Sequence, residues 1–459
     1  MSVTNPHFCS LTDLLSAQRS ATHLVAFSAH QQIDWATFQR EVEQNRSWLS
    51  NQPAQRVALC FANSYQFAIA FFACCVANKS LVLPGNYQPE AVKELEEHFD
   101  LLLHDDAIDI AHSVTSAQLT ALAENGQDLE TLPSLTALNP STIALTLFTS
   151  GSSGKPKAID KTLIQLETEI AILEQLWGER LGPSRIESTV SHQHIYGLLF
   201  RLLWPLCAGR AFAIANLEFP EQLVHHAAEN VALISSPALL KRLNEEHQTS
   251  PLGTVFSSGG PLPHSAATHS KALFGQLPIE VFGSTETGGI AYRQQLQAST
   301  PWQLFPSIDA ELNNEGCLRL KSAHIDGENW YQTADECRFH DKVHFELLGR
   351  TDRIVKVEEK RISLVEVEKR LDQLDWIDES AVISMQDGQR LVLNAVIVLT
   401  PAGQQHMSQL GKGKFWLALR NELRNWLEPI AIPRRYRVLS EIPLNSQGKR
   451  QVADIEKLF

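Results

Sequence analysis

Short apolar segments that alternate with longer helical patterns constrain the fold of this chain more than any other feature. The segment RVALCF at 56–61 has no polar alternation, which is typical of a strand buried on both faces of a sheet. An apolar helical pattern follows at 64–78, and then a second strand, SLVLPG, at 80–85. The same order returns at 142–177, and further apolar strands recur between 210 and 284. This alternation predicts an α/β fold with a largely parallel sheet.

The pattern changes near residue 349, where the segment LLGRTDRIVKVEEKRIS is dense in charge. Beyond it, Ser363 and Glu366 have the spacing of a helix-capping box, and strands at 380–385 and 390–400 precede a helix at 414–427. A chain of 459 residues is too long for one core. We therefore predict a large, multilayered α/β N-terminal domain at 1–351 and a small α+β C-terminal domain at 352–459.

Composition limits which partners the protein can bind and in which cellular compartment it is expected. The net charge of −13 disfavours nucleic acid and anionic membranes, because both call for a basic surface. The seven cysteines are scattered without a Cys-x-x-Cys pair, so neither a disulfide framework nor a zinc site is indicated. The N-terminus lacks a signal-peptide pattern, and the apolar runs at 67–77 and 194–209 are too short or too interrupted to span a membrane. We expect a cytoplasmic protein.

The loop TSGSSGKPK at 149–157 directly follows the strand at 142–148. The carboxyl ends of strands are where α/β proteins bind ligands. The glycines of this loop permit tight curvature, its hydroxyls donate hydrogen bonds and its lysines supply charge, a combination typical of a phosphate cradle. It is not a Walker loop, because Thr149 and Pro156 stand where that motif needs Gly and Ser or Thr. The candidate phosphate-binding residues are Thr149, Ser150, Gly151, Ser152, Ser153, Gly154, Lys155 and Lys157.

Four further motifs carry candidate site residues. In VFGSTETGG at 281–289, a strand runs into a glycine-rich turn with one carboxylate, Glu286. A carboxylate close to a phosphate needs a cation between them, so Glu286 is a candidate Mg²⁺ ligand and Thr285 a candidate phosphate contact. Asp335 in YQTADECRF could accept hydrogen bonds from a ribose diol. The last two motifs are LLGRTDRI, with Arg350, and PLNSQGKRQ, with Lys449.

In this order, the five motifs resemble those of the adenylate-forming superfamily, which includes acyl- and aryl-CoA synthetases, adenylation domains of non-ribosomal peptide synthetases and beetle luciferases. The resemblance covers residues 35–451. It implies that Lys449 is the catalytic lysine, that Phe282 packs on adenine, and that His194 in SHQHIYGL lines the acyl pocket. The segment SSGGPLP is similar to the one that lines the adenine and acyl pockets. The other implied nucleotide contacts are Gly259, Gly260, Gly283, Ser284, Asp335 and Arg350.

The resemblance implies a two-step reaction that uses ATP and Mg²⁺. A carboxylic acid is first converted to an acyl-adenylate with release of pyrophosphate, and Lys449 and a metal held by Glu286 would reduce the charge repulsion in that step. A thiol then takes the acyl group, after the small, mobile C-terminal domain has rotated about the hinge residue Asp352.

Two thiol acceptors are open, the thiol of CoA and that of a holo acyl carrier protein. The acceptor is expected to act in trans, because no phosphopantetheine-attachment motif is visible in the chain. Glu359 stands where many CoA-dependent members have Gly, which raises the weight of a carrier protein. The basic residues nearby are either a solvated face or a docking surface for a CoA phosphate or an acidic carrier protein; they are Arg353, Lys356, Lys360 and Arg361.

The small carboxylic acid substrate is expected to be fatty or aromatic. No obvious lysine or aspartate accompanies the pocket residues His194, Tyr196, Gly259 and Gly283 to bind an amino acid's amine. A luciferase-like oxygenase or an amino-acid-adenylating enzyme would use the same adenylating residues and is the alternative function. His192 and His194 could suggest a metal, but no third ligand cluster accompanies them.

Overall fold

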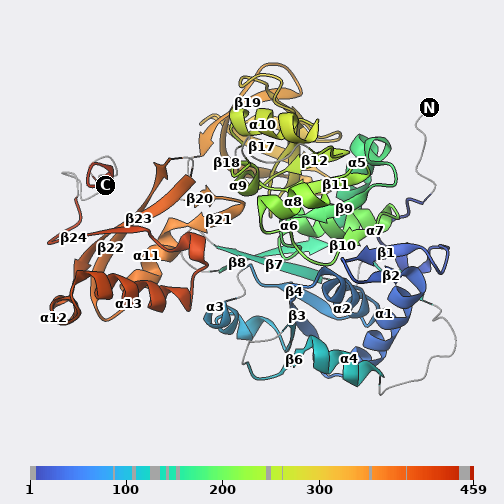
Figure 1. The fold of residues 1–459 in the computed structure, drawn as a ribbon, viewed down its shortest axis with the longest axis horizontal. Coiled ribbons are helices and arrows are strands. Elements are labelled where there is room, and N and C mark those ends of the chain that lie inside the picture. The colour runs from blue at the N-terminus through green and yellow to red at the C-terminus, as the bar shows by residue number, and fades with distance from the viewer. Residues whose placement is uncertain are drawn as a thin grey trace. The chain divides into compact units, whose positions relative to one another are not determined.

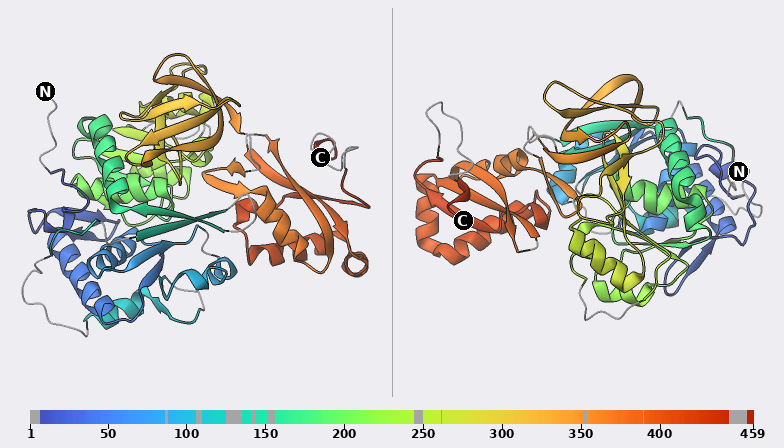
Figure 2. Two further views of the ribbon diagram at one scale, coloured as in Figure 1. Left: turned by 180° about the vertical axis from the view of Figure 1, so that it is seen from behind. Right: turned by 90° about the horizontal axis from the view of Figure 1, so that it is seen from above.

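The computed structural model of the chain describes residues 7–85, 88–105, 110–124, 135–140, 144–150, 156–243, 250–260, 262–350, 354–388, 390–443 and 455–459. The chain divides into two compact units, whose elements Figures 1 and 2 show. We call residues 1–85, 96–147 and 158–351 the larger unit, and residues 86–95, 148–157 and 352–459 the smaller unit. The smaller unit therefore takes in two short segments from the N-terminal part of the sequence.

Six strands of the described residues form a sheet that belongs mainly to the larger unit (Figure 1). Their order is β6-β5-β3-β4-β7-β8, and the four pairs from β6 to β7 are parallel. The predicted apolar helix forms as α2, Ser64–Val76, and the side chain of Asn63 caps its N-terminus. Helix α2 packs on β3 and β4 and against α1, Trp35–Ser50. The strands are β3 Arg56–Cys60, β4 Ser80–Leu83, β5 Leu101–His104, β6 Ser113–Thr115, β7 Ala144–Ser150 and β8 Pro156–Thr162.

A second sheet of the larger unit contains thirteen strands of the described residues, and only one half of it is the parallel sheet that the apolar strands predicted. Strands β1, β10, β9, β11, β12 and β13 pair in parallel, in that order. Helices α8, Pro220–His226, α9, Pro237–Leu240, and α10, His264–Phe274, connect the later strands. The strands are β1 Leu24–Phe27, β9 Arg185–Ser188, β10 Phe212–Ala213, β11 Val231–Ser235, β12 Thr254–Ser257 and β13 Ile279–Ser284.

The other half of this sheet is antiparallel, which the sequence pattern did not predict. From β13 the order continues β14-β15-β19-β18-β17-β16, each pair antiparallel, and at the opposite edge β2, Gln32–Asp34, pairs antiparallel with β1. Many of these strands have one exposed face, so their sequences mix polar and apolar residues. The strands are β14 Gly288–Arg293, β15 Trp302–Leu304, β16 Asp309–Leu312, β17 Cys317–Ser322, β18 Asp326–Phe339 and β19 His344–Arg350.

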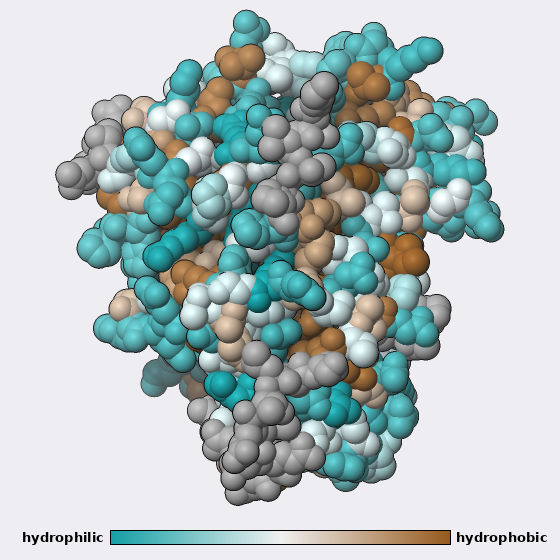
Figure 3. All heavy atoms as spheres, turned by 90° about the vertical axis from the view of Figure 1, so that its right-hand side faces the viewer, coloured by the Kyte–Doolittle hydropathy of each residue, from teal (hydrophilic) through white to brown (hydrophobic). Residues whose placement is uncertain are grey.

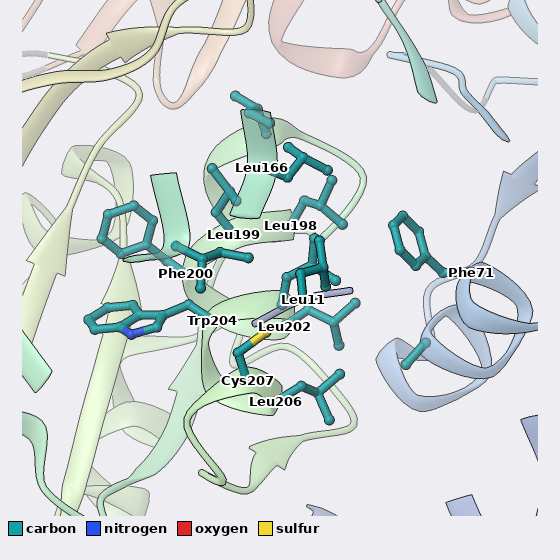
Figure 4. Close-up of a cluster of buried hydrophobic side chains, with 14 of the residues drawn as sticks. Leu11, Phe71, Leu166, Leu198, Leu199, Phe200, Leu202, Trp204, Leu206 and Cys207 are labelled. Atoms are coloured by element: carbon teal, nitrogen blue, oxygen red, sulfur yellow. The ribbon is translucent and has the colours of Figure 1, made fainter. Parts of the chain in front are cut away.

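The apolar run at 194–209 is a core element of the larger unit. It forms α6, Ile195–Gly197, a π-helix, Leu198–Leu203, and α7, Trp204–Cys207. Figure 4 shows its leucine and aromatic side chains beside Leu11, Phe71 from α2 and Leu166 from α5, Leu163–Leu181. The guanidinium of Arg201 is fully buried within this core and donates to the carbonyl oxygens of Val190, Ala213 and Ile214 at 2.9, 3.2 and 3.3 Å. These backbone acceptors are what makes a buried arginine tolerable.

The smaller unit has its own core and its own described sheet. Strands β22 and β23 are antiparallel, and β24 pairs in parallel with β23. A hairpin of β20, Ile354–Val357, and β21, Lys360–Ser363, precedes α11, Leu364–Asp372, where Ser363 Oγ accepts the N–H of Glu366 at 3.2 Å. The remaining elements are β22 Ile377–Asp387, β23 Arg390–Leu399, α12 Pro401–Leu410, α13 Lys412–Arg424 and β24 Arg435–Leu439.

No helix in the described part of the chain is long and apolar enough to cross a membrane. On the face that Figure 3 shows, hydrophilic side chains cover most of the surface, and the hydrophobic ones form small separated groups.

The capping box at the start of α5 gives a stability prediction. Thr162 Oγ1 accepts the N–H of Gln165 at 3.2 Å, and Gln165 Oε1 accepts the N–H of Thr162 at 3.0 Å. We expect Thr162→Ala to lower the free energy of unfolding by about 1 kcal/mol, because one helix N–H loses its partner. Thr162→Ser should restore most of this loss. Urea unfolding followed by tryptophan fluorescence measures both variants, and equal stability of the Ala and Ser variants would contradict the capping role.

Candidate active site

The turn that links β13 to β14 presents the candidate metal ligand. Gly283 pairs with Gly289 and Ser284 with Gly288, with an irregularity in register next to Gly283. Thr287 is fully buried within the turn, where its Oγ1 accepts the N–H of Ser284 at 3.1 Å and donates to the carbonyl of Gly288 at 2.9 Å. These bonds fix the turn from inside and leave Thr285 and Glu286, at its tip, half-buried.

A second predicted segment lies at the same edge of the sheet. Strands β12 and β13 are parallel neighbours, so the SSGG segment after β12 and the turn after β13 share the carboxyl edge. Ser258 Oγ donates to the carbonyl of Val281 at 2.8 Å and ties the two segments together. Gly259 has φ of +95°, a conformation that glycine adopts without strain. The structure thus brings Gly259 and Gly260 beside the strand that ends in Gly283 and Ser284.

Three buried polar residues behind this turn were missed by the sequence analysis. We call Lys161, Glu169 and His324 the buried polar cluster; their exposed fractions are 3%, 2% and 0%. Lys161 Nζ, from β8, donates to the carbonyl of Glu286 at 2.8 Å, and Glu169, from α5, accepts the N–H of Gly289 at 2.7 Å. His324 Nε2 lies 2.9 Å from the carbonyl oxygen of Gly289, which can only accept, so Nε2 carries the proton.

The charges in the buried polar cluster oppose the cost of their own burial. Burial raises the pKa of Glu169, while His324, the N–H of Gly289 and Lys161 act in the opposite direction. Burial lowers the pKa of Lys161, against the attraction of Glu169 and Glu286. One signal in the sequence could have placed Lys161 inward, because residues two apart on a strand share a face and Ile159 is buried.

The aromatic residue of the turn motif faces the core. Phe282 is 7% exposed, and its ring centroid lies 5.5 Å from that of Trp302 and 6.2 Å from that of Phe345. Its contact with adenine stays a prediction.

The two histidines of the SHQHIYGL segment, His192 and His194, have different surroundings. His192 is buried; its Nε2–H donates to the carbonyl of Phe61 at 2.9 Å, and its Nδ1 lies 3.0 Å from Ser64 Oγ. Burial and the charge of Arg201 hold the pKa of His192 well below its ordinary value. Within the described residues, no group of three or more His, Cys, Asp or Glu side chains could hold a metal. His194 is half-buried at the N-terminus of α6.

The remaining predicted nucleotide residues are only partly described. The register of β18 and β19 places Asp335, which is 5% exposed, opposite Arg350. Thr149 and Lys157 belong to the smaller unit, where Thr149 is half-buried and Lys157 exposed. Ser150 lies in β7. Seven residues with predicted roles lie outside the described residues, namely five of the predicted phosphate loop, the predicted hinge residue and the predicted catalytic lysine: Gly151, Ser152, Ser153, Gly154, Lys155, Asp352 and Lys449.

A basic recess of about 350 Å³ lies on the smaller unit. Arg420 donates to the carbonyl of Arg434 and lies 5.8 Å from the ring centroid of Tyr436, and Arg424 donates to Asn421 Oδ1 at 3.0 Å. In the described part of the chain, no carboxylate forms an ion pair with Arg420, Arg424 or Arg434. Lys360, from the basic segment singled out in the sequence, is instead paired with Glu428. The recess is lined by Arg420, Arg424, Pro429, Ile432, Pro433 and Arg434.

The sequence was compared with protein families and with known proteins, and it matches one family. The model of the AMP-binding enzyme family matches residues 15–317. The chain is 27% identical over 321 residues to a 4-coumarate–CoA ligase of Halorhodospira halophila, which covers 68% of this chain and 75% of that protein. It is 25% identical over 359 residues to a D-alanine–D-alanyl carrier protein ligase of Staphylococcus aureus, which covers 68% and 70%.

The fold has a counterpart among solved structures. A double mutant of o-succinylbenzoate CoA synthetase from Bacillus subtilis matches with a TM-score of 0.81 at 17% identity, over 98% of both chains. The predicted fold class, a large α/β part followed by a smaller C-terminal part, is thereby confirmed. Since the family model spans well over half of the sequence, this chain belongs to the AMP-binding enzyme family of adenylate-forming ligases.

Proposed function

We propose that this chain activates a fatty or aromatic carboxylic acid with ATP and transfers the acyl group to the thiol of CoA or of a holo acyl carrier protein. A carboxylate oxygen of the acid attacks the α-phosphorus of ATP, and the bond to pyrophosphate breaks. The thiol sulfur then attacks the carbonyl carbon of the acyl-adenylate, loses its proton, and AMP leaves. The turn that presents Thr285 and Glu286 at the carboxyl edge of parallel strands is the observation that carries this proposal.

The donor set of this turn suits Mg²⁺. Glu286 supplies one half-buried carboxylate, and the described residues contain no closed cage of acidic or histidine ligands. Mg²⁺ ordinarily binds through one or two carboxylates and takes phosphate oxygens and water as its other ligands. Glu286 would therefore hold a metal that arrives with ATP, and the ion would supply positive charge to the departing pyrophosphate.

The roles of the other residues follow from their chemistry. Thr285 would donate its hydroxyl to a phosphate oxygen, and Lys449 would lie between the attacking carboxylate and the α-phosphate. Asp335 would accept hydrogen bonds from the ribose diol. The buried ring of Phe282 would form the floor of the adenine site, and His194 the wall of the acyl pocket.

Measurement of pyrophosphate release from ATP and Mg²⁺ tests the proposal. A panel of fatty, benzoic and cinnamic acids is assayed without acceptor, with CoA and with a holo acyl carrier protein. We expect one class of acid to support turnover and one thiol to accelerate it. Absence of acid-dependent release with every acid, while ATP still binds, would contradict the ligase proposal. An oxygen-dependent product with no thiol requirement would favour the oxygenase alternative.

The basic recess gives a prediction for the second step. Both acceptors carry phosphate groups, and the arginines of the recess have no carboxylate partner among the described residues. We expect Arg424→Glu/Arg434→Glu to raise the KM for the acceptor thiol by roughly tenfold, because two attractive charges become repulsive. Acid-dependent ATP–pyrophosphate exchange, which needs no acceptor, should be unchanged. An equal loss in both assays would show that the recess does not act on the acceptor.

A further inference from the structure

We propose that the buried polar cluster, Lys161, Glu169 and His324, positions the metal-binding turn and thereby sets the affinity for Mg²⁺·ATP. The inference rests on the proposed function of Glu286 and assigns positioning roles to three residues that none of the recognised motifs contains. None of the three is argued to touch substrate.

The cluster holds the backbone of the turn at two residues, Glu286 and Gly289. Lys161 binds the carbonyl of Glu286 itself, at 2.8 Å. Three residues further on, Gly289 is held on both sides, its N–H by Glu169 at 2.7 Å and its carbonyl by His324 at 2.9 Å. The three side chains come from β8, from α5 and from the segment between β17 and β18. Each therefore ties the turn to a different part of the larger unit.

The fit between the cluster and the turn leaves no free space. A Cβ at Gly288, where φ is +66°, would lie 2.1 Å from Glu169 Oε2. A Cβ at Gly289 would lie 2.4 Å from the ring of Phe305 and 3.2 Å from Glu169 Oε1. The two glycines of the motif thus admit the carboxylate of Glu169 against the backbone. The carboxylate of Glu169 therefore packs directly against the backbone of the turn.

Burial of ionisable side chains argues against a purely stabilising role. A buried pair of opposite charges gains little over apolar residues of the same volume, because desolvation opposes the attraction. The polar groups instead fix the position of the turn, because each hydrogen bond is directional and holds one backbone group of the turn in place. Lys161 acts on the same residue whose carboxylate is the candidate metal ligand, so its loss should be felt first in metal-dependent nucleotide binding.

The test compares Lys161→Met with the double variant Lys161→Met/Glu169→Gln. The single variant leaves Glu169 buried with one cation fewer, so it should lose both thermal stability and Mg²⁺·ATP affinity. The double variant removes both charges and should recover most of the melting temperature. It still lacks the bond to the carbonyl of Glu286, so we expect its Kd for ATP, titrated calorimetrically over a series of Mg²⁺ concentrations, to stay about tenfold above that of the wild type.

Thr162→Ala is the matched control. It weakens the neighbouring helix start without touching the turn, and should lower the melting temperature with no change in the Mg²⁺ requirement. The KM for the acid should change little in the cluster variants. Recovery of both melting temperature and Mg²⁺·ATP affinity in the double variant would overturn the inference, as would unchanged affinity in both cluster variants. If no acid supports turnover by the wild type, the proposed function fails, but the binding titration still decides this inference.

Discussion

We expect Lys449→Ala to lower the rate of acyl-adenylate formation by at least about 10²-fold. This is the size of effect seen when one preorganised donor to a developing negative charge is removed. In the proposed reaction, the first step brings an anionic carboxylate onto the negatively charged α-phosphate, and Lys449 between them would lower that repulsion. In the second step the thiol attacks the carbonyl carbon of the acyl-adenylate, so no carboxylate has to approach the phosphate and this cation is not needed between them. Thioester formation from a preformed acyl-adenylate should therefore be spared.

Two assays separate the steps for this variant. ATP–pyrophosphate exchange reports adenylation alone, and the reaction of a synthetic acyl-adenylate with the thiol reports transfer alone. Lys414→Ala, which removes an exposed lysine of α13 in the smaller unit, is the control and should leave both unchanged. Equal losses in the two assays for Lys449→Ala would contradict this division of labour.

The parallel part of the fold could be predicted from the sequence because its strands are buried on both faces. The segment at 231–236 has no polar alternation and forms β11, whose residues are all buried. Strand β18, by contrast, is mostly exposed over its first half, and the residues that would reveal it are mixed with Asp, Glu and Asn. A search for apolar runs does not find such a strand, although its partners β17 and β19 are its neighbours in the sequence.

Some residues of the candidate site could likewise be predicted from the sequence, and others could not. Glu286 and Thr285 could be proposed because they are adjacent in one motif at the end of a strand. Lys161 and His324 were missed, because they lie outside that motif, 125 and 38 positions from Glu286 in the sequence. A lone charged residue on a strand is ordinarily solvated. Only the fold shows that Lys161 and His324 donate hydrogen bonds to backbone carbonyl oxygens of the turn.

Arg201 was noticed in the sequence, but its hydrogen-bond partners could not be predicted from it. In the sequence it interrupts an apolar run, and this interruption correctly argued against a membrane span. The structure adds that the residue lies entirely in the core, where backbone carbonyls of three separate residues accept its hydrogen bonds. Burial lowers its pKa to about 9, which still leaves the guanidinium charged at neutral pH. The set of acceptors is made by tertiary structure and leaves no trace in the local pattern.

Gly283→Ala should reduce adenylation by about 10²-fold, because a displacement of the reacting groups by as little as 1 Å can have that effect. A Cβ at this position would lie 2.1 Å from the carbonyl oxygen of Gly288 and 2.9 Å from its carbonyl carbon. Both are backbone atoms, so no rotation of a side chain can relieve the clash. The hairpin must open between β13 and β14, and with it the turn that carries Thr285 and Glu286.

Gly327→Ala is the matched control for this variant, since a Cβ there meets its nearest neighbour, Ala323 Cα, at an ordinary 3.9 Å. Pyrophosphate exchange and the melting temperature should be measured for both variants. We expect Gly283→Ala to be destabilised by about 1–3 kcal/mol, which is typical of overpacking, and to lose far more activity than that loss of folded protein explains. Near wild-type exchange by Gly283→Ala would mean that the turn can shift without harm, and that the position of Glu286 does not limit the chemistry.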